Sequence, residues 1–427
     1  MPRVFIPFVP NWVNGIRDTY DFLTEVFATR DGSEQRRSQR IQPRRTITTA
    51  VLLDGDRGRL FHDAVNRART GEIAIPDFTA TRATVQSVAA GEGATVLLVD
   101  KRPGWLMAGA DVSLMLEDRR ARRATVGQVN GNNITFLQTL TGITAGAVIL
   151  PTLPAQFAAT NTLMQPGSPD VQTATLAFDI EPGTAHRTPT PLTGQMVGDA
   201  AIFYGRYVLM RKPNLLRAPT VTVNLPFQSV DYNRGVVKRF APVPITSRTL
   251  TATWLGQTRA DTLTLLDIFL RCKGRAGEIY LPTWGSDFPP ILFRSSSTIT
   301  VEGAEFAEAY ADDEAHRSVL FTLNDGSMTP REIVEVYESG GNSIIRFDTA
   351  PPARTDIARI SWMFVARFAQ DSLTIEWLTD EVANVTMSFI TLRNLPVEDG
   401  YGSNWILTTG YWRDLGQWVD TDVWRDG

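Results

Sequence analysis

The sequence predicts a mainly β protein with two tandem β-sandwich or barrel units, each with one helix and an inserted small antiparallel β-barrel. Three observations support this fold class. Two similar ten-residue sequences occur almost half a chain length apart. Each copy ends a segment that has the pattern strand, helix, strand. Each copy is then followed by short alternating segments with turn dipeptides between them, which is typical of small antiparallel barrels or sandwiches.

The repeated sequence is RTGEIAIPDF at 69–78 and RAGEIYLPTW at 275–284. The two copies share Arg, Gly, Glu, Ile and Pro at the same positions, and both end in an aromatic residue. They lie 206 positions apart in a chain of 427 residues. Self-similarity of this kind indicates a duplicated structural unit.

The similarity extends upstream of the repeated sequence. RTIT at 45–48 corresponds to RTLT at 248–251, and Arg36 corresponds to Arg239, both at an offset of 203 positions. The offset is three residues larger at the Gly-Glu-Ile motif. The insertion falls in a segment that has helical spacing in both copies.

Each strand–helix–strand segment begins with a predicted strand. RTITTAVLL and RTLTATWLG are rich in Thr, Ile and Leu, and their apolar and polar residues alternate with period two. The next segments, RGRLFHDAVNRAR and RADTLTLLDIFLRCK, have apolar residues at roughly helical spacing. We expect Gly71 and Gly277 to cap these helices at their C-termini. EIAIP and EIYLP then form strands that proline ends.

A block of about 70 residues follows each copy. Turn dipeptides separate its short strands at 130–131, 324–326 and 340–341. Each half then closes with a pair of strands, AVILPTLPAQF with QTATLAFDI and ARISWMFVARF with SLTIEWLTDEVANVTMSFITL. The predicted domains are the first β unit at 1–85 plus 155–190, its inserted barrel at 86–154, the second β unit at 191–293 plus 365–400, its inserted barrel at 294–364, and an aromatic C-terminal arm at 401–427.

Composition excludes several classes of protein. The formal net charge is −4, so a strongly basic nucleic-acid coat is excluded and no membrane attraction is expected. The single cysteine, Cys272, excludes internal disulfides and cysteine-based zinc sites. No apolar run approaches the roughly 20 residues that span a bilayer, and the amino terminus lacks an apolar signal-peptide region. We expect synthesis in the cytoplasm.

The sequence shows no catalytic or cofactor-binding motif. The three histidines, His62, His186 and His316, are isolated from one another and lack metal-ligand spacing. DGDRG, which starts at Asp54, has only the first part of a calcium loop. We therefore expect no catalytic residues, no metal, no cofactor and no enzymatic activity. The basic run at 30–45 is expected to be a solvated loop or a charged subunit contact.

Four of the ten tryptophans lie in the last 27 residues. A segment this short cannot bury its own aromatic side chains, so they need another surface. Two interpretations are open: a strap across its own domain, or a docking arm for a neighbouring subunit or partner, since Trp is enriched in interface hot spots. The candidate partner-contact residues are Trp405, Trp412, Trp418 and Trp424.

Three stretches together resemble a known family: YDFLTEVFATRDGSEQRR, the segment ending in RTGEIAIPDF, and VARFAQDSLTIEWLTDEVANVTMSFITL. They look like the distal tail or baseplate hub proteins of siphophages and the tail-tip proteins of related gene transfer agents. In that family the pattern belongs to a β-sandwich that builds a ring at the tail tip. The resemblance covers most of both halves, but this chain has the unit twice, whereas a simple distal tail protein has one ring-forming sandwich.

The resemblance implies a structural virion protein at the tail tip of a bacteriophage. Three chains would give a homotrimeric pseudo-six-fold ring, with a homohexamer as the alternative. The implied partners are the tail tube protein on one side and hub or receptor-binding tail proteins on the other. Double-stranded DNA would pass through the channel without specific binding, and no membrane is involved.

Two other functions stay open from the sequence. A carbohydrate-binding receptor-recognition protein of the tail would use exposed tryptophans for sugar stacking, and the inserted blocks offer Trp105 and Trp362. A tail-associated hydrolase would need paired carboxylates held by the scaffold.

Overall fold

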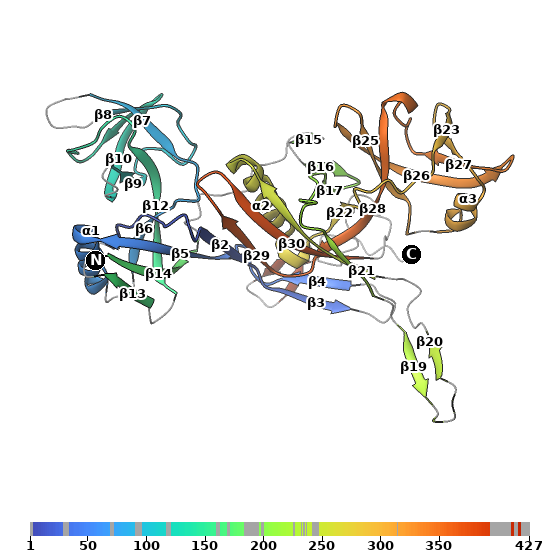
Figure 1. Ribbon diagram of the computed structural model, residues 1–427, viewed down its shortest axis with the longest axis horizontal. Helices are drawn as coiled ribbons and strands as arrows, with labels where there is room; N and C mark the ends of the chain where they lie inside the picture. The colour runs from blue at the N-terminus through green and yellow to red at the C-terminus, as the bar shows by residue number, and fades with distance from the viewer. Residues whose placement is uncertain are drawn as a thin grey trace.

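The structure is a computed structural model (Figure 1). It describes residues 3–28, 34–68, 72–89, 96–116, 121–158, 163–168, 171–182, 196–197, 200–224, 227–231, 233, 235, 237–240, 247–313, 315–392, 411–413 and 417–419. Strands dominate these residues, and most of them join one large sheet system. The predicted fold class, a mainly β protein of two tandem units with inserted small barrels, is confirmed. No helix among the described residues has the length and apolar character needed to cross a membrane.

The first repeat is a sheet structure covered by one helix. Its elements are β1 (Val4–Phe5), β2 (Ile16–Asp21), β5 (Arg44–Asp54), α1 (Gly55–Arg67), β6 (Ile73–Pro76), β12 (Val148–Phe157), β13 (Leu163–Ser168) and β14 (Val171–Ile180). The strand β5 lies between β2 and β14 and is antiparallel to both. The short strand β6 pairs with β1 in parallel and with β12 in antiparallel orientation.

The second repeat contains the same set of elements. They are β17 (Arg206–Leu209), β18 (Thr220–Asn224), β21 (Ser247–Gly256), α2 (Arg259–Cys272), β22 (Ile279–Pro282), β28 (Ile357–Phe368), β29 (Ser372–Trp377) and β30 (Ala383–Thr391). Two further strands, β15 (Met196–Val197) and β16 (Ala200–Phe203), precede β17 and extend its edge.

Strand pairing is the same in the two repeats. The antiparallel pairs β2–β5, β5–β14, β6–β12 and β13–β14 correspond to β18–β21, β21–β30, β22–β28 and β29–β30. The parallel pair β1–β6 corresponds to β17–β22. Register agrees as well: Asp18 lies opposite Ile47, and Val221 lies opposite Leu250, at a constant offset of 203 positions. The duplication seen in the sequence is thus also present in the topology.

Each repeat carries a small antiparallel barrel with its own hydrophobic core. The first barrel consists of β7 (Ala83–Ala89), β8 (Val96–Val99), β9 (Asp111–Met115), β10 (Ala121–Asn130) and β11 (Asn133–Phe136). The second consists of β23 (Ile291–Arg294), β24 (Thr298–Val301), α3 (Glu305–Tyr310), β25 (Ser318–Leu323), β26 (Met328–Ser339) and β27 (Asn342–Phe347). The long strands β12 and β28 connect each barrel to its repeat, because their first halves pair with β9 and β25. Figure 1 shows both barrels on the same side of the molecule. The domain boundaries given above stay predictions.

A β-hairpin follows the second strand of each repeat. The first consists of β3 (Thr24–Ala28) and β4 (Glu34–Ser38), and the second of β19 (Gln228–Asp231) and β20 (Val237–Phe240). The β3–β4 hairpin lies along the second repeat, whereas the β19–β20 hairpin projects away from the body (Figure 1).

One glycine of the repeated motif has a different role from the one its sequence predicts. Helix α2 ends at Cys272, and the left-handed residues that follow are Lys273 (φ 50°) and Gly274 (φ 67°). Gly277, with φ −87°, is therefore not the C-cap, and that prediction is wrong. Its N–H donates to the Cys272 carbonyl at 2.7 Å, and a Cβ atom at Gly277 would lie 2.6 Å from the Cys272 Cα. The motif needs glycine because the chain passes so close to the helix end. The first copy's Gly71 lies outside the described residues.

Candidate functional site

The two histidines that the structure describes, His62 and His316, each contact a polar side chain. His62 Nε2 contacts Gln172 Oε1 at 2.9 Å, and His316 Nδ1 contacts Asp313 Oδ2 at 2.7 Å. His186 lies outside the described residues. In the described part of the chain, no group of three or more His, Cys, Asp or Glu side chains could hold a metal ion. Buried polar networks lie instead at, and directly beside, the contact region between the two repeats, which we call the joint.

Strand β2 of the first repeat forms the centre of the joint. It pairs with β5 of its own repeat on one edge and with β29 of the second repeat on the other. The side chains of one cross-strand pair meet directly, since Thr19 Oγ1 and Thr374 Oγ1 are 3.0 Å apart. A single hydrophobic core then extends through both repeats, from Ile6 to Phe389. The joint is therefore a continuous sheet over a shared core.

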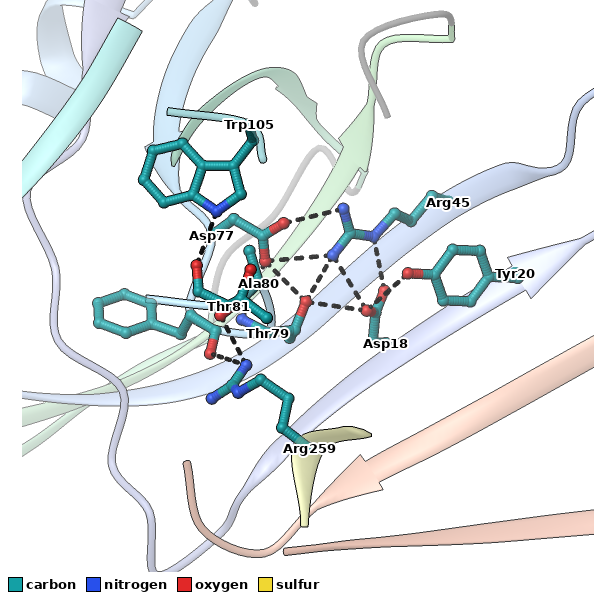
Figure 2. Close-up of polar contacts among 10 residues, drawn as sticks. Asp18, Tyr20, Arg45, Asp77, Thr79, Ala80, Thr81, Trp105 and Arg259 are labelled. Atoms are coloured by element: carbon teal, nitrogen blue, oxygen red, sulfur yellow. Dashed lines mark hydrogen bonds and ion pairs between the residues drawn. The ribbon is translucent and has the colours of Figure 1, made fainter. Parts of the chain in front are cut away.

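A buried ionic cluster lies at β2 (Figure 2). Arg45 Nε donates to Asp18 Oδ1 at 2.8 Å, and Arg45 Nη1 donates to Asp77 Oδ2 at 3.1 Å. Arg45 Nη2 donates to Thr79 Oγ1 at 2.6 Å, and the Tyr20 hydroxyl donates to Asp18 Oδ2 at 3.0 Å. All five side chains are buried. Asp18, Tyr20 and Arg45 come from neighbouring strands, whereas Asp77 and Thr79 come from the turn after β6.

The charges of this cluster favour the ionised form of Arg45 despite its burial. Burial alone would lower the pKa of the Arg45 guanidinium, but Asp18 and Asp77 outweigh burial and hold it well above its usual value. A buried arginine with two carboxylates is stable only while all three partners are present. The ion pairs and hydrogen bonds hold the five side chains in place, and burial keeps both carboxylates away from solvent.

Arg259, at the start of α2, connects this turn to the second repeat. Its Nη1 donates to the Ala80 carbonyl at 2.8 Å and to the Phe78 carbonyl at 3.3 Å (Figure 2). Its guanidinium lies 4.9 Å from the centre of the Trp377 ring. Nearer the surface, Arg82 of the first repeat forms an ion pair with Asp380 of the second repeat. The helix of the second repeat thus binds carbonyl groups of the first.

A second ionic network lies beneath the β3–β4 hairpin. Arg36 of β4 forms an ion pair with Glu278 of the repeated motif, and Arg206 Nε binds the same carboxylate at 2.7 Å. Arg367 binds Glu34 of β4 through two hydrogen bonds, of 2.6 and 2.9 Å. Burial would raise the pKa of Glu34, but the positive charges of Arg367, Arg36 and Arg275 hold it below its usual value of 4.5. The hairpin is thus attached to the second repeat by alternating charges.

The hairpin's first residue is also fixed. The Thr24 N–H and hydroxyl each donate to the Asp371 carboxylate at 2.8 Å. The same carboxylate accepts the N–H of Arg275 at 2.9 Å. Asp371 therefore holds the β3–β4 hairpin against the second copy of the repeated motif.

These joint residues were only partly visible in the sequence. Arg36 and Arg45 belong to the basic run at 30–45, which we expected to be a solvated loop or a charged subunit contact. Both are buried, so the solvated-loop interpretation is wrong for them. Asp18 and Asp77 carried no signal, because nothing in the sequence connects them with the basic run, whereas Glu278 is the glutamate of the repeated Gly-Glu-Ile motif. The available signals were the arginines that match at an offset of 203 and the glutamate that both copies of the repeated sequence share.

The structure describes two of the four tryptophans that are predicted to contact a partner. Trp412 and Trp418 lie opposite each other in a ladder of β31 (Tyr411–Arg413) and β32 (Gln417–Val419). Trp405 and Trp424 lie outside the described residues. In the inserted barrels, the Trp105 indole N–H donates to the Thr81 carbonyl at 2.8 Å. Trp362 is buried against the rings of the second barrel. Neither barrel tryptophan is exposed for stacking on a sugar.

Comparison with known proteins adds little to this geometry. No protein-family model matches the chain, and no curated protein matches it significantly. Among solved structures, it matches the N-terminal CBM22-1–CBM22-2 tandem domain of Xyn10C from Paenibacillus barcinonensis. Sequence identity is 8% and the TM-score is 0.12, with 92% of this chain and 99% of that chain covered. A TM-score this low carries no argument about fold or function.

Proposed function

We propose that the chain is a structural protein of a phage tail tip, a distal tail or hub protein. It forms a ring that joins the tail tube to the baseplate or receptor-binding apparatus and leaves a channel for DNA. The resemblance of three sequence stretches to distal tail proteins supports the location. The joint supports the architecture.

The joint is the single observation that carries the proposal. Its two sides differ: β2 and the β3–β4 hairpin come from the first repeat, and β29 and Glu278 belong to the second. Such head-to-tail contacts between similar units generate rings when the rotation closes. A chain that already contains one contact of this kind supplies two adjacent positions of a ring.

A structural role also agrees with the state of the joint carboxylates. Asp18 and Asp77 accept hydrogen bonds from Arg45 and Thr79, and both side chains are buried. A general acid or base must reach its substrate within hydrogen-bonding distance. Enclosed carboxylates of this kind stabilise packing, and we propose no enzymatic activity for them.

The proposed assembly has three chains in a pseudo-six-fold ring, with six chains as the alternative. Tail tube protein would bind one face, and hub or receptor-binding proteins would bind the other. DNA would pass through the channel without specific binding, and a net charge of −4 is compatible with a lining that is not densely basic.

Electron microscopy of particles from the cells that encode this chain tests the location. Gold-labelled antibody against the chain should bind at the distal end of the tail, between tube and fibres. Label on the capsid, along the tail shaft or on no particle would contradict the proposal. As a control, antibody preabsorbed with the purified chain should leave the tails unlabelled.

A further inference from the structure

The second repeat carries its own copy of the strand that forms the joint. Strand β18 corresponds to β2, but among the described residues β18 pairs with β21 alone, whereas β2 pairs on both edges. Asp18 and Tyr20 of β2 are 0% and 2% exposed. Their counterparts Val221 and Val223 are 56% and 51% exposed. Apolar residues thus occupy an open edge at the positions that the joint buries in the first repeat.

The second hairpin matches the first residue for residue. Val26 pairs with Arg36 in β3–β4, and Ser229 pairs with Arg239 in β19–β20, at the same offset of 203. Phe227 and Phe240 of this hairpin region are half exposed, and Figure 1 shows the hairpin away from the rest of the chain. Arg239 lies over the Phe227 ring at 5.1 Å. A projecting hairpin with exposed aromatic rings is typical of an interaction surface.

The first repeat carries the complementary surface. Strand β13 corresponds to β29, and in the described part of the chain it pairs only with β14, so its outer edge has no strand partner. Glu72 corresponds to Glu278 of the repeated motif and is exposed. The second repeat presents the same two features in the joint. Its strand β29 pairs with β2, and its carboxylate Glu278 forms an ion pair with Arg36.

We infer that β18 and the β19–β20 hairpin of one chain dock onto β13 and Glu72 of a second copy of this chain. The contact reproduces the joint, but between two chains. This inference rests on the proposed function in one respect, namely that the chain assembles with copies of itself. Transfer of the β2–β29 register predicts an antiparallel pair in which Thr222 lies opposite Leu163 and Val221 opposite Met164. Arg239 then lies beside Glu72.

A second copy fits these surfaces better than an unrelated partner. The donor side and the acceptor side are both present on one chain, and each matches its counterpart in the joint by strand direction, register and charge. Open strand edges pair readily with another chain unless they are protected. Because the two sides differ, the contact propagates from copy to copy.

Disulfide trapping tests the register of the contact. Thr222→Cys and Leu163→Cys are made in separate chains, because their counterparts Thr19 and Thr374 are in side-chain contact. Oxidation of the mixed variants should give a disulfide-linked dimer, and neither variant alone should do so. The native Cys272 is buried and should not interfere.

The matched control is Thr220→Cys mixed with Leu163→Cys. Residues two positions out of register lie about 7–8 Å apart, which is too far for a disulfide. Equal cross-linking of both mixtures, or cross-linking of neither when the proteins form rings, would overturn the inference and leave the proposed ring intact.

A charge exchange tests the hairpin contact. Arg239→Glu and Glu72→Arg should each raise the concentration needed for assembly by about tenfold, and the double variant should restore assembly. Lys238→Glu is the control, since its counterpart Gln35 stays exposed in the joint. Circular dichroism melting of each variant verifies folding.

The outcomes separate the two proposals. Rings that form equally well from both single variants contradict this contact but support a ring built in another way. Wild-type protein that stays monomeric at every concentration, alone and with tail proteins, overturns both the contact and the proposed ring.

Discussion

The same arginine has different partners in the two repeats. Arg45 binds Asp18 and Asp77, whereas its counterpart Arg248 has Val221 in place of Asp18 and Thr283 in place of Asp77. Arg248 lies instead over the Phe364 ring, 4.8 Å from its centre. Identity at one sequence position therefore does not predict an ionic cluster, because the partner residues decide whether the charge is buried.

Replacement of Arg45 should destabilise the protein much more than replacement of Arg248. Arg45→Met leaves two buried carboxylates without their cation, which costs about 3–5 kcal/mol in the free energy of unfolding. Arg248→Met removes a contact with one ring, which costs about 0.5–1 kcal/mol. Urea unfolding followed by tryptophan fluorescence measures both values. Equal losses would contradict the role given to the cluster.

The hairpin contact should weaken in acid. The folded-state pKa of Glu34 lies below its usual value of 4.5, so its ion pair with Arg367 contributes stability above about pH 4.5. That contribution is lost as the pH falls through the lower folded-state pKa. Wild type should therefore be more stable than Glu34→Gln near neutral pH, and the difference should shrink below about pH 4.5.

Unfolding measurements on both proteins across the acid range provide the test. Glu25→Gln, at an exposed position of the same hairpin, is the control and should change stability little at any pH. A difference between wild type and Glu34→Gln that stayed constant with pH would show that the ion pair is not the cause.

At the scale of elements, periodicity predicted what is local. Alternation and helical spacing placed the strand–helix–strand segments and the strands of both inserted barrels, because these elements bury one face regularly. The two hairpins were not predicted. EQRRS of β4 has no apolar alternation, since it is stabilised by ion pairs with residues more than two hundred positions away.

The glycine of the repeated motif should be sensitive to a single methyl group. Gly277→Ala places a Cβ atom 2.6 Å from the Cys272 Cα, so the turn after α2 must shift. The expected loss is about 1–3 kcal/mol in the free energy of unfolding. Gly104→Ala, where a Cβ atom meets nothing within 4 Å, should change stability by less than about 0.5 kcal/mol. Thermal unfolding of both variants decides, and an unaffected Gly277→Ala would contradict the close approach.

At the scale of the whole molecule, β2 makes two repeats into one body. It completes the sheet of its own repeat and adds a strand to the next, over a shared core. The sequence predicted that the unit occurs twice, but it did not predict which strand connects the copies. Strand order between distant segments depends on long-range pairing, and period-two alternation is the same for every partner.

The aromatic arm should matter for assembly and not for folding. Deletion of residues 401–427 should leave both repeats folded, because the shared core among the described residues is built from positions 6 to 389. Assembly or docking to tail proteins should weaken, since Trp405, Trp412, Trp418 and Trp424 are the predicted contact residues. Circular dichroism and sedimentation of the truncated chain provide the measurement. A truncated chain that still builds infectious tails would remove the arm from the account.

The most direct test of the central claim is the native mass of the assembled particle. One chain has a mass of 47.3 kDa. The account predicts a single species with three times this mass, or six times in the alternative, that stops growing as concentration rises, because a closed ring has no free ends. A monomer at all concentrations, or a series of species that lengthens without limit, would contradict a closed ring of repeats.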